Sequence, residues 1–239
     1  MKKLVIILLL ILAVLSLMSC NKTRAKTLAR ILSTETGDYE GEEISRERIK
    51  ELEDGIKEYS KDVERVVKAN AEIGVYYRML ALEYIDFAMY KLALENLEKS
   101  MDYYPSNPVL SYYAGLSKAN IARAESDRTK SLSLFNEAEA YYIAAVKLRN
   151  NYSEAMYALS VLYMFDLYNP ENARPLLEKL ISINPQDWEA LTLYARYMVE
   201  IGDIDSAVEL YNEISENAWD DSMKEQAALN RDALLAGRL

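Results

Sequence analysis

Small and large apolar residues recur along this chain in a fixed spacing that appears four times. In each copy a small residue is followed at the fourth position by a large residue, at the seventh by another residue suited to burial, and at the twelfth by a residue that ends a helix. The four copies are Ala93, Leu97, Ser100 and Pro105; Ala138, Tyr142, Ala145 and Asn150; Ala173, Leu177, Leu180 and Pro185; and Ala207, Tyr211, Ile214 and Trp219. Offsets of four and seven put side chains on one face of a helix.

The interval between copies is 34 residues, except that the second copy carries 11 extra residues and the third carries one. A fixed period of this size is typical of stacked helical hairpins, so the pattern predicts an all-α solenoid of about four hairpins. We expect these hairpins at residues 74–107, 108–152, 153–187 and 188–219. The 11 extra residues are expected to lengthen both helices of the second hairpin, whose charged tip near 125–131 would then project.

Two further helices are expected to flank the hairpins. Residues 44–73 place apolar side chains at alternating spacings of three and four, which predicts one long helix with a narrow apolar stripe. The stripe consists of Ile49, Leu52, Ile56, Tyr59, Val63 and Val66. We expect it to pack on the first hairpin; a coiled coil between two chains is disfavoured, because the stripe lasts only about three heptads. Residues 220–239 are predicted to form a C-terminal capping helix, because the last hairpin otherwise exposes its apolar face.

The first helices of three hairpins share a second pattern, in which two large residues flank a small one. It runs Tyr77-x2-Leu80-Ala81-x2-Tyr84, Met156-x2-Leu159-Ser160-x2-Tyr163 and Leu191-x2-Tyr194-Ala195-x2-Met198. Together with the first pattern, this resembles the tetratricopeptide repeat family. The resemblance covers about residues 74–219 and implies a right-handed superhelix that binds protein partners. The second hairpin departs most, with Ser111 and Lys118 at large apolar positions.

The resemblance also implies a partner-binding groove, because the first helices of such arrays line a concave surface. The matching positions are Arg78, Leu82, Ile85, Asp86, Tyr112, Leu116, Asn120, Tyr157, Val161, Met164, Phe165, Thr192, Arg196 and Glu200. The Lys and Asn clamp with which some family members hold a terminal carboxylate is absent. The groove centre is instead aromatic and aliphatic, which suits an extended or helical segment anchored by apolar side chains, with Tyr157 and Phe165 as expected anchors. Two alternatives stay open: the long N-terminal helix covers these residues, or they are ordinary packing and the register is off by one.

The N-terminal 19 residues are similar to a signal peptide. A short basic start precedes an apolar run over residues 4–18, which is shorter than the roughly 20 residues of a membrane-spanning helix. The run ends in the sequence LMSC, which resembles the lipobox of bacterial lipoproteins. That resemblance implies cleavage before Cys20, a covalent lipid on Cys20, and a tether over residues 20–43. We therefore expect the protein to be anchored by lipid to a bacterial membrane with its globular part outside the cytoplasm; an uncleaved signal anchor is the alternative.

Charge and composition narrow the function further. The chain has 28 basic and 38 acidic side chains, no histidine and one cysteine. A formal net charge of −10 disfavours nucleic acid as a partner, because phosphate binding requires a basic surface. Without histidine, a zinc cluster, a phosphate loop or a nucleophile elbow, the sequence predicts no enzyme, no metal site and no cofactor besides the lipid on Cys20.

These observations favour a membrane-tethered scaffold or adaptor that binds protein partners in the periplasm or extracytoplasmic space. Two alternatives keep the fold and change the role: an accessory subunit of a solute-uptake system that depends on a substrate-binding protein, or an assembly factor for the envelope or outer membrane. A stable trimer with a lined channel would favour the transport role, whereas a monomer with an open groove would favour the adaptor.

Overall fold

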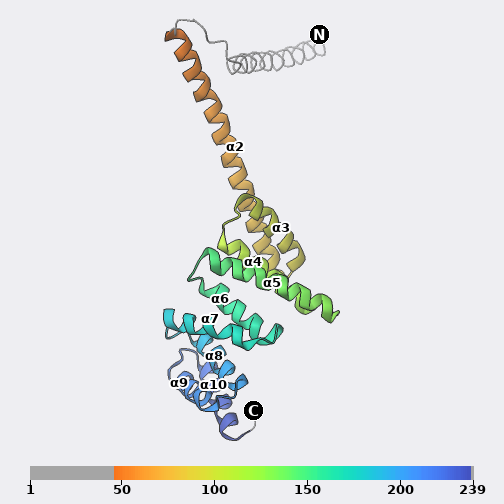
Figure 1. Cartoon of the computed structure of the whole chain (residues 1–239), viewed down its shortest axis with the longest axis vertical. Coiled ribbons are helices and arrows are strands. Elements are labelled where there is room, and N and C mark those ends of the chain that lie inside the picture. The colour runs from red at the N-terminus through yellow and green to blue at the C-terminus, as the bar shows by residue number, and fades with distance from the viewer. Residues whose placement is uncertain (1–45, 238–239) are drawn as a thin grey trace, which may run out of the picture. The chain divides into compact units, whose positions relative to one another are not determined.

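The computed structural model of this chain describes the backbone of residues 46–237 (Figure 1). Within that range every regular element is a helix. The chain divides into two units between Asp62 and Val63, so that the hairpins belong to the second unit except for the N-terminal part of the first hairpin's first helix. The expected signal peptide, the tether and the lipidation site Cys20 lie outside the described residues.

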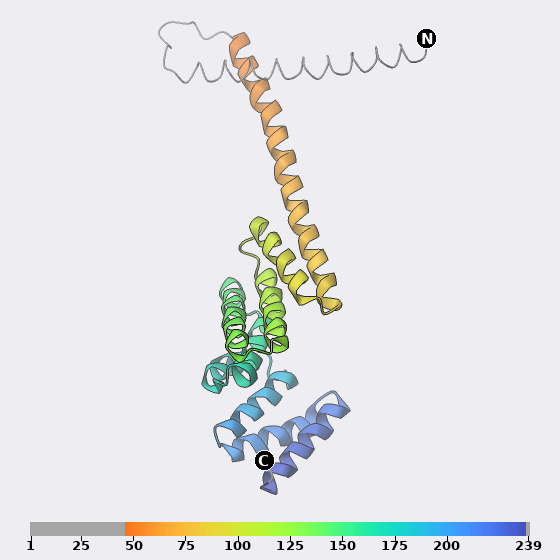
Figure 2. The ribbon, with the colours of Figure 1, turned by 90° about the vertical axis from the view of Figure 1, so that its right-hand side faces the viewer.

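Consecutive helices of the second unit pack on one another in chain order, as Figure 2 shows. The helices are α2 (Arg46–Asp86), α3 (Tyr90–Tyr103), α4 (Pro108–Ala124), α5 (Arg128–Leu148), α6 (Ser153–Val161) with its π-helical continuation η1 (Leu162–Asp166), α7 (Pro170–Ile183), α8 (Trp188–Glu200), α9 (Ile204–Asn217) and α10 (Asp221–Leu235). The pairs α2–α3, α4–α5, α6/η1–α7 and α8–α9 are the four hairpins, and α10 packs against α9. The predicted all-α solenoid is therefore confirmed.

The recurring residue sets form the core of these hairpins. The first three members of every set are buried, and they all lie on second helices: Ala93, Leu97, Ser100, Ala138, Tyr142, Ala145, Ala173, Leu177, Leu180, Ala207, Tyr211 and Ile214. Each second helix ends two residues before the fourth member of its set; α3 ends at Tyr103 before Pro105, and α7 ends at Ile183 before Pro185. The spacing in the sequence thus predicted both the buried face and the end of each second helix.

The 11 extra residues of the second hairpin lengthen both of its helices. Helix α4 has 17 residues against 13 in α8, and α5 has 21 against 14 in α9. The increments of four and seven residues are close to one and two turns of 3.6 residues, so each helix keeps the same face toward its partner. The turn at 125–127 joins the two helices, and the Asp127 carboxylate caps α5 by accepting the backbone N–H groups of Thr129 and Lys130.

The single extra residue of the third hairpin lies inside its first helix. The α6–η1 segment spans 14 residues where α8 spans 13, and the loops on either side have the same lengths in both hairpins. One residue is not a whole turn, and the helix accommodates it as the π-helical turn η1. After this turn the register is shifted by one residue, so that Met164 is buried in the core whereas Phe165 is exposed.

Helix α2 corrects the expectation of a separate N-terminal helix that packs on the first hairpin. The helix continues through residues 73 and 74 without a break and itself provides the first helix of hairpin one. Two hydrogen bonds join α2 to helix α3 and the residue that follows it. The Tyr104 hydroxyl donates to the carbonyl of Ala71 at 2.8 Å, and the Ser100 hydroxyl donates to the carbonyl of Gly74 at 2.7 Å.

The apolar stripe of α2 is exposed. Val63 and Val66 in the second unit are 62% and 59% exposed, so the prediction that they pack on the first hairpin is wrong. The physical reason is length, since α3 has only 14 residues and α2 has 41. Among the helices of the described residues, none is both long and apolar enough to cross a membrane.

Candidate partner-binding groove

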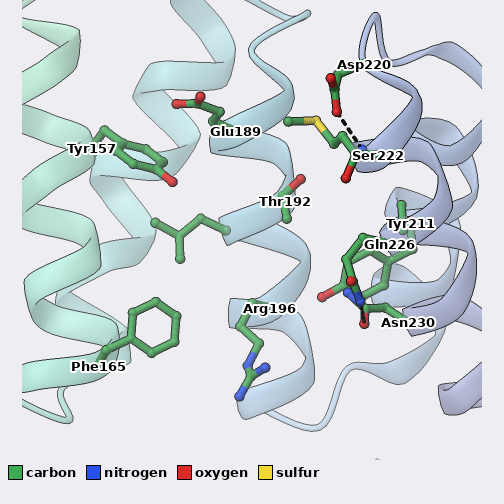
Figure 3. Close-up of a pocket in the computed structure, with 13 residues that line it drawn as sticks. Tyr157, Phe165, Glu189, Thr192, Arg196, Tyr211, Asp220, Ser222, Gln226 and Asn230 are labelled. Carbon is green, nitrogen blue, oxygen red and sulfur yellow. Dashed lines mark hydrogen bonds between the residues drawn. The ribbon is translucent and has the colours of Figure 1, made fainter.

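A hollow of about 640 Å³ lies between the first helices of hairpins three and four and the C-terminal helix (Figure 3). Its lining comes from α6 and η1 on one side, α8 and α9 in the middle, and the beginning and middle of α10 on the other side. The lining residues are Tyr157, Phe165, Glu189, Thr192, Leu193, Arg196, Tyr211, Asp220, Ser222, Met223, Gln226, Ala227 and Asn230.

The wall formed by α6 and η1 is aromatic. Tyr157 and Phe165 both point toward α8 across the hollow (Figure 3). Phe165 is 44% exposed because the π-helical turn directs it out of the core, and a ring in that position can contact a bound molecule without any rearrangement. Leu193 and Ala227 are buried among the lining residues and provide an apolar base.

Charges of opposite sign stand at the two ends of the hollow. Glu189 and Asp220 lie at one end and Arg196 lies at the other (Figure 3). The Asp220 carboxylate accepts the backbone N–H of Met223 at 2.8 Å and so caps α10. Arg196 pairs with Glu200 one turn further along α8, at 3.5 Å between Nε and Oε1, and both side chains are about half exposed. Such an exposed ion pair contributes little to the stability of the fold, so Arg196 can exchange Glu200 for an acidic group of a ligand.

Two tyrosines of the lining stay neutral at physiological pH. Burial raises the pKa of Tyr157, and the carboxylates of Glu189 and Asp187 raise it further. Burial also raises the pKa of Tyr211, while Arg196 and a hydrogen bond with Asn230 oppose that change. Both phenols therefore act as hydrogen-bonding groups, and the charge of the hollow comes from its carboxylates and Arg196.

Four of the residues predicted for the groove meet in this hollow. They are Tyr157, Phe165, Thr192 and Arg196, from two successive hairpins. Val161 is half-buried and packs against the buried cluster that includes Leu159, Leu162 and Leu193. Met164 is a correction: it is a core residue, because the π-helical turn moves it inward and places Phe165 on the groove surface.

The predicted residues of hairpin two serve mainly in packing. Tyr112 is half-buried and its ring contacts those of Tyr113, Tyr142 and Tyr152, with centroids 5.0, 6.1 and 5.5 Å away. The Asn120 amide donates to the carbonyl of Leu116 in its own helix at 2.8 Å, and Leu116 is half-buried. Asn120 also lines a separate hollow of about 340 Å³ beside residues 88–92.

The predicted residues of hairpin one lie near the end of α2, away from the lining of the larger hollow. Ile85 packs against the buried cluster that includes Ala81 and Leu97. Arg78 and Leu82 are half-buried, and Asp86 is exposed. The structure therefore gathers only part of the predicted groove into one hollow. The concave residues of hairpins one and two are divided between packing and solvent.

The far wall of the hollow, from α10, was missing from the sequence prediction. The sequence predicts a cap over residues 220–239, and the structure shows that Met223, Gln226 and Asn230 of this helix also face the hollow. A signal for this was present, because Met223-x2-Gln226-Ala227-x2-Asn230 has the spacing of the first-helix pattern, with the small residue Ala227 where α8 has Ala195. Both alanines are buried. Helix α10 therefore occupies the place of a fifth first helix.

The described residues include no group of three or more His, Cys, Asp or Glu side chains arranged to hold a metal ion. The hollow offers aromatic rings, amides, hydroxyls and three charged groups around an apolar base. This chemistry fits recognition of a molecule with both apolar and charged parts.

Comparison with known proteins identifies the repeats. Residues 164–228 match the family described as tetratricopeptide repeat. The chain is 25% identical over 191 residues to a TPR repeat-containing protein of Borreliella burgdorferi, which covers 76% of this chain and 79% of the relative.

Solved structures of the same fold are similar at lower identity. A thermophilic TPR protein of Thermus thermophilus gives a TM-score of 0.57 at 18% identity, covering 77% of this chain and 97% of that one. YrrB, described as a TPR protein with an unusual peptide-binding site, gives 0.56 at 19% identity, covering 73% and 82%. MamA of Desulfovibrio magneticus gives 0.52 at 16% identity, covering 69% and 94%. Together with the buried repeat sets, these likenesses show that residues 164–228 match the tetratricopeptide repeat and that the chain has the fold of solenoids built from such repeats.

Proposed function

We propose that this protein is a scaffold that binds an extended segment of a partner protein in the hollow between α6, α8 and α10. The observation that supports this most directly is Phe165, an aromatic side chain 44% exposed beside Tyr157 at the wall of a hollow of about 640 Å³. YrrB, a protein of the same fold, is described as having an unusual peptide-binding site. A segment of a partner protein is therefore the proposed ligand.

The lining specifies the chemistry of the bound segment. An apolar side chain of the ligand would pack between Phe165, Tyr157 and Leu193, and burying such a side chain contributes about 1.5–3 kcal/mol. A basic residue of the ligand would lie near Glu189 and Asp220, and an acidic residue near Arg196. Since the charges stand at opposite ends, they would fix the direction in which the segment runs.

The ligand preference can be tested by selecting random peptides displayed on phage against the immobilised chain. We expect selected peptides to share an apolar residue with a basic residue on one side and an acidic residue on the other. Titration calorimetry of a selected peptide should then show that Phe165→Ala weakens binding at least about 10-fold, or about 1.4 kcal/mol. Ile183→Ala is the matched control, because Ile183 is 43% exposed and lies outside the hollow.

Full affinity in both Tyr157→Ala and Phe165→Ala would remove this site from consideration. Loss of affinity in the Ile183→Ala control would show that peptides bind another surface or that substitution disturbs the fold. Circular dichroism of each variant distinguishes these two results.

We further propose that a lipid on Cys20 holds the scaffold at a bacterial membrane, outside the cytoplasm. The support is the sequence LMSC at the end of the N-terminal apolar run. Two acyl chains give stable membrane attachment where one is marginal, and tethering raises the effective concentration of the scaffold toward partners at the same surface. Cells supplied with an alkyne-bearing palmitate analogue should label the chain. Cys20→Ala should abolish the label and release the protein from the membrane fraction; an unlabelled wild-type chain would refute the anchor.

A further inference from the structure

Helix α2 presents apolar side chains to solvent at the spacing of a heptad repeat. Positions a and d from Ile49 to Ile73 hold Ile49, Leu52, Ile56, Tyr59, Val63, Val66, Asn70 and Ile73. The seven apolar residues among them are each at least 37% exposed. Within residues 49–73, Val67 is the one other large apolar residue, so the apolar side chains are concentrated on the a and d positions. We call these eight residues the α2 seam.

The structure strengthens a coiled-coil interpretation that the sequence alone disfavoured. Because α2 continues without a break, the seam includes Asn70 and Ile73 and extends over 25 residues, which exceeds three heptads. The first hairpin does not cover the seam residues Val63 and Val66, which are among the most exposed of the set. A repeat of seven residues matches the 3.5 residues per turn of a left-handed coiled coil.

The first hairpin sets the end of the seam. The next a position after Asn70 is Tyr77, whose ring stacks on Tyr103 of α3 with centroids 6.4 Å apart. A Cβ at Gly74 would stand 2.7 Å from Tyr103 Cβ, so α3 lies directly against α2 at that level. Residues of the same chain thus contact α2 at Gly74 and Tyr77, and we place the end of the seam at Ile73.

The residue types along the seam indicate the number and direction of the strands. Position a holds β-branched Ile49, Ile56 and Val63, and position d holds one leucine, Leu52. β-Branched residues at a combined with leucine at d favour two parallel strands. Asn70 is the single polar residue of the seam, and an asparagine at one a position fixes register and strand number. In a parallel, in-register pair the two Asn70 amides face each other and can exchange hydrogen bonds. In an antiparallel pair position a faces position d, so each Asn70 amide would meet an apolar side chain.

We propose that the α2 seam binds the same seam of a second copy of this chain in a parallel two-stranded coiled coil. The pairing buries the a and d side chains of both copies and leaves the charged residues at the other positions in water. A pair of chains would present two partner-binding grooves. The proposal is independent of what those grooves bind.

Disulfide trapping in the full chain tests contact and direction together. The background is Cys20→Ala, so that an introduced thiol is the only cysteine. In a parallel pair Val66→Cys lies beside its own counterpart, and mild oxidation should convert most of the chain to a covalent dimer. Lys68→Cys is the control on the outer side of the helix and should react at least 10-fold more slowly. Equal rates, or no dimer from Val66→Cys, would overturn the proposal.

Sedimentation equilibrium of the same Cys20→Ala chain tests the stoichiometry. We expect a dimer whose dissociation constant rises at least 10-fold in the variant with Val63→Asp and Val66→Asp together. Its far-UV circular dichroism and thermal midpoint should keep the values of the hairpin array, which would show that the array is folded. A monomeric or trimeric parent chain, or an unchanged dimer in the charged variant, would refute the two-stranded pairing.

Discussion

Gly115→Ala is expected to destabilise the chain even though alanine is the better helix former. Gly115 is buried in α4, where it faces α5. A Cβ at this position would stand 2.7 Å from Cδ1 and 2.8 Å from Cε1 of Tyr142. Tyr142 is 2% exposed and its ring also contacts Tyr112, so it has little room to turn away. The close approach of two helices at this point therefore requires glycine.

Two opposing effects set the magnitude. Replacing glycine by alanine inside a helix contributes about 0.8–1 kcal/mol through helix propensity. Overpacking a close contact in the core costs about 1–3 kcal/mol. The net result is a loss of about 1 kcal/mol, which corresponds to a thermal midpoint about 2–4 °C lower in a chain of this size.

Tyr142→Leu supplies the informative second background, because Leu97 and Leu177 occupy the matching position in two other hairpins. Without the ring, Gly115→Ala should stabilise the chain by up to about 1 kcal/mol, so the sign of the effect reverses. Urea unfolding of the four chains, followed by circular dichroism at the helical band, measures both effects. Equal stabilisation by Gly115→Ala in the two backgrounds would refute the reasoning.

Three further predictions concern tyrosine ionisation, an ion pair and a buried hydroxyl. Burial raises the pKa of Tyr141 and Tyr152 to about 12 from 10.0, so the unfolded chain loses these protons at lower pH than the folded chain. The stability of the fold should therefore be steady below pH 10 and fall between pH 10 and 12, and urea midpoints measured across that range would check this. Arg123 holds the Asp166 carboxylate with two hydrogen bonds of 2.6 and 3.1 Å, so Arg123→Ala should cost about 1–2 kcal/mol in urea unfolding, and no change would refute it. The Ser117 hydroxyl has no partner among the described residues, so Ser117→Ala should raise the thermal midpoint slightly; a clear decrease would contradict this.

The second helices of the hairpins could be predicted in detail from the sequence. Ala173, Leu177 and Leu180 are spaced so that one helix face must be apolar, and Pro185 must follow the end of that helix. These constraints are local, so they hold whatever the neighbouring hairpins do. The structure accordingly buries all three side chains and ends α7 at Ile183.

The register of the groove could be predicted only in part. The interval between Ala138 and Ala173 shows that one residue is extra, but a loop and a helix can both hold it. The structure places it in η1, and this choice decides that Phe165 rather than Met164 reaches the groove. The outcome depends on how the whole helix packs, which the local composition does not determine.

The roles of α2 and α10 depended on neighbours that the sequence does not reveal. The apolar stripe of α2 was visible, but the short length of α3 leaves it uncovered. In α10 the pattern around Ala227 was present, but a terminal helix also has to cover the last hairpin, and that second requirement obscured its place in the groove.

The long second hairpin has a practical consequence for protein engineering. Its two helices are longer than those of the fourth hairpin by close to whole turns. Each added turn moves the tip outward by about 5.4 Å and returns the side chains to the same angular position around the helix. A recognition loop grafted at residues 125–127 could therefore be displaced stepwise from the array with the same orientation. Insertions of one or two residues would instead rotate the graft or distort the supporting helix.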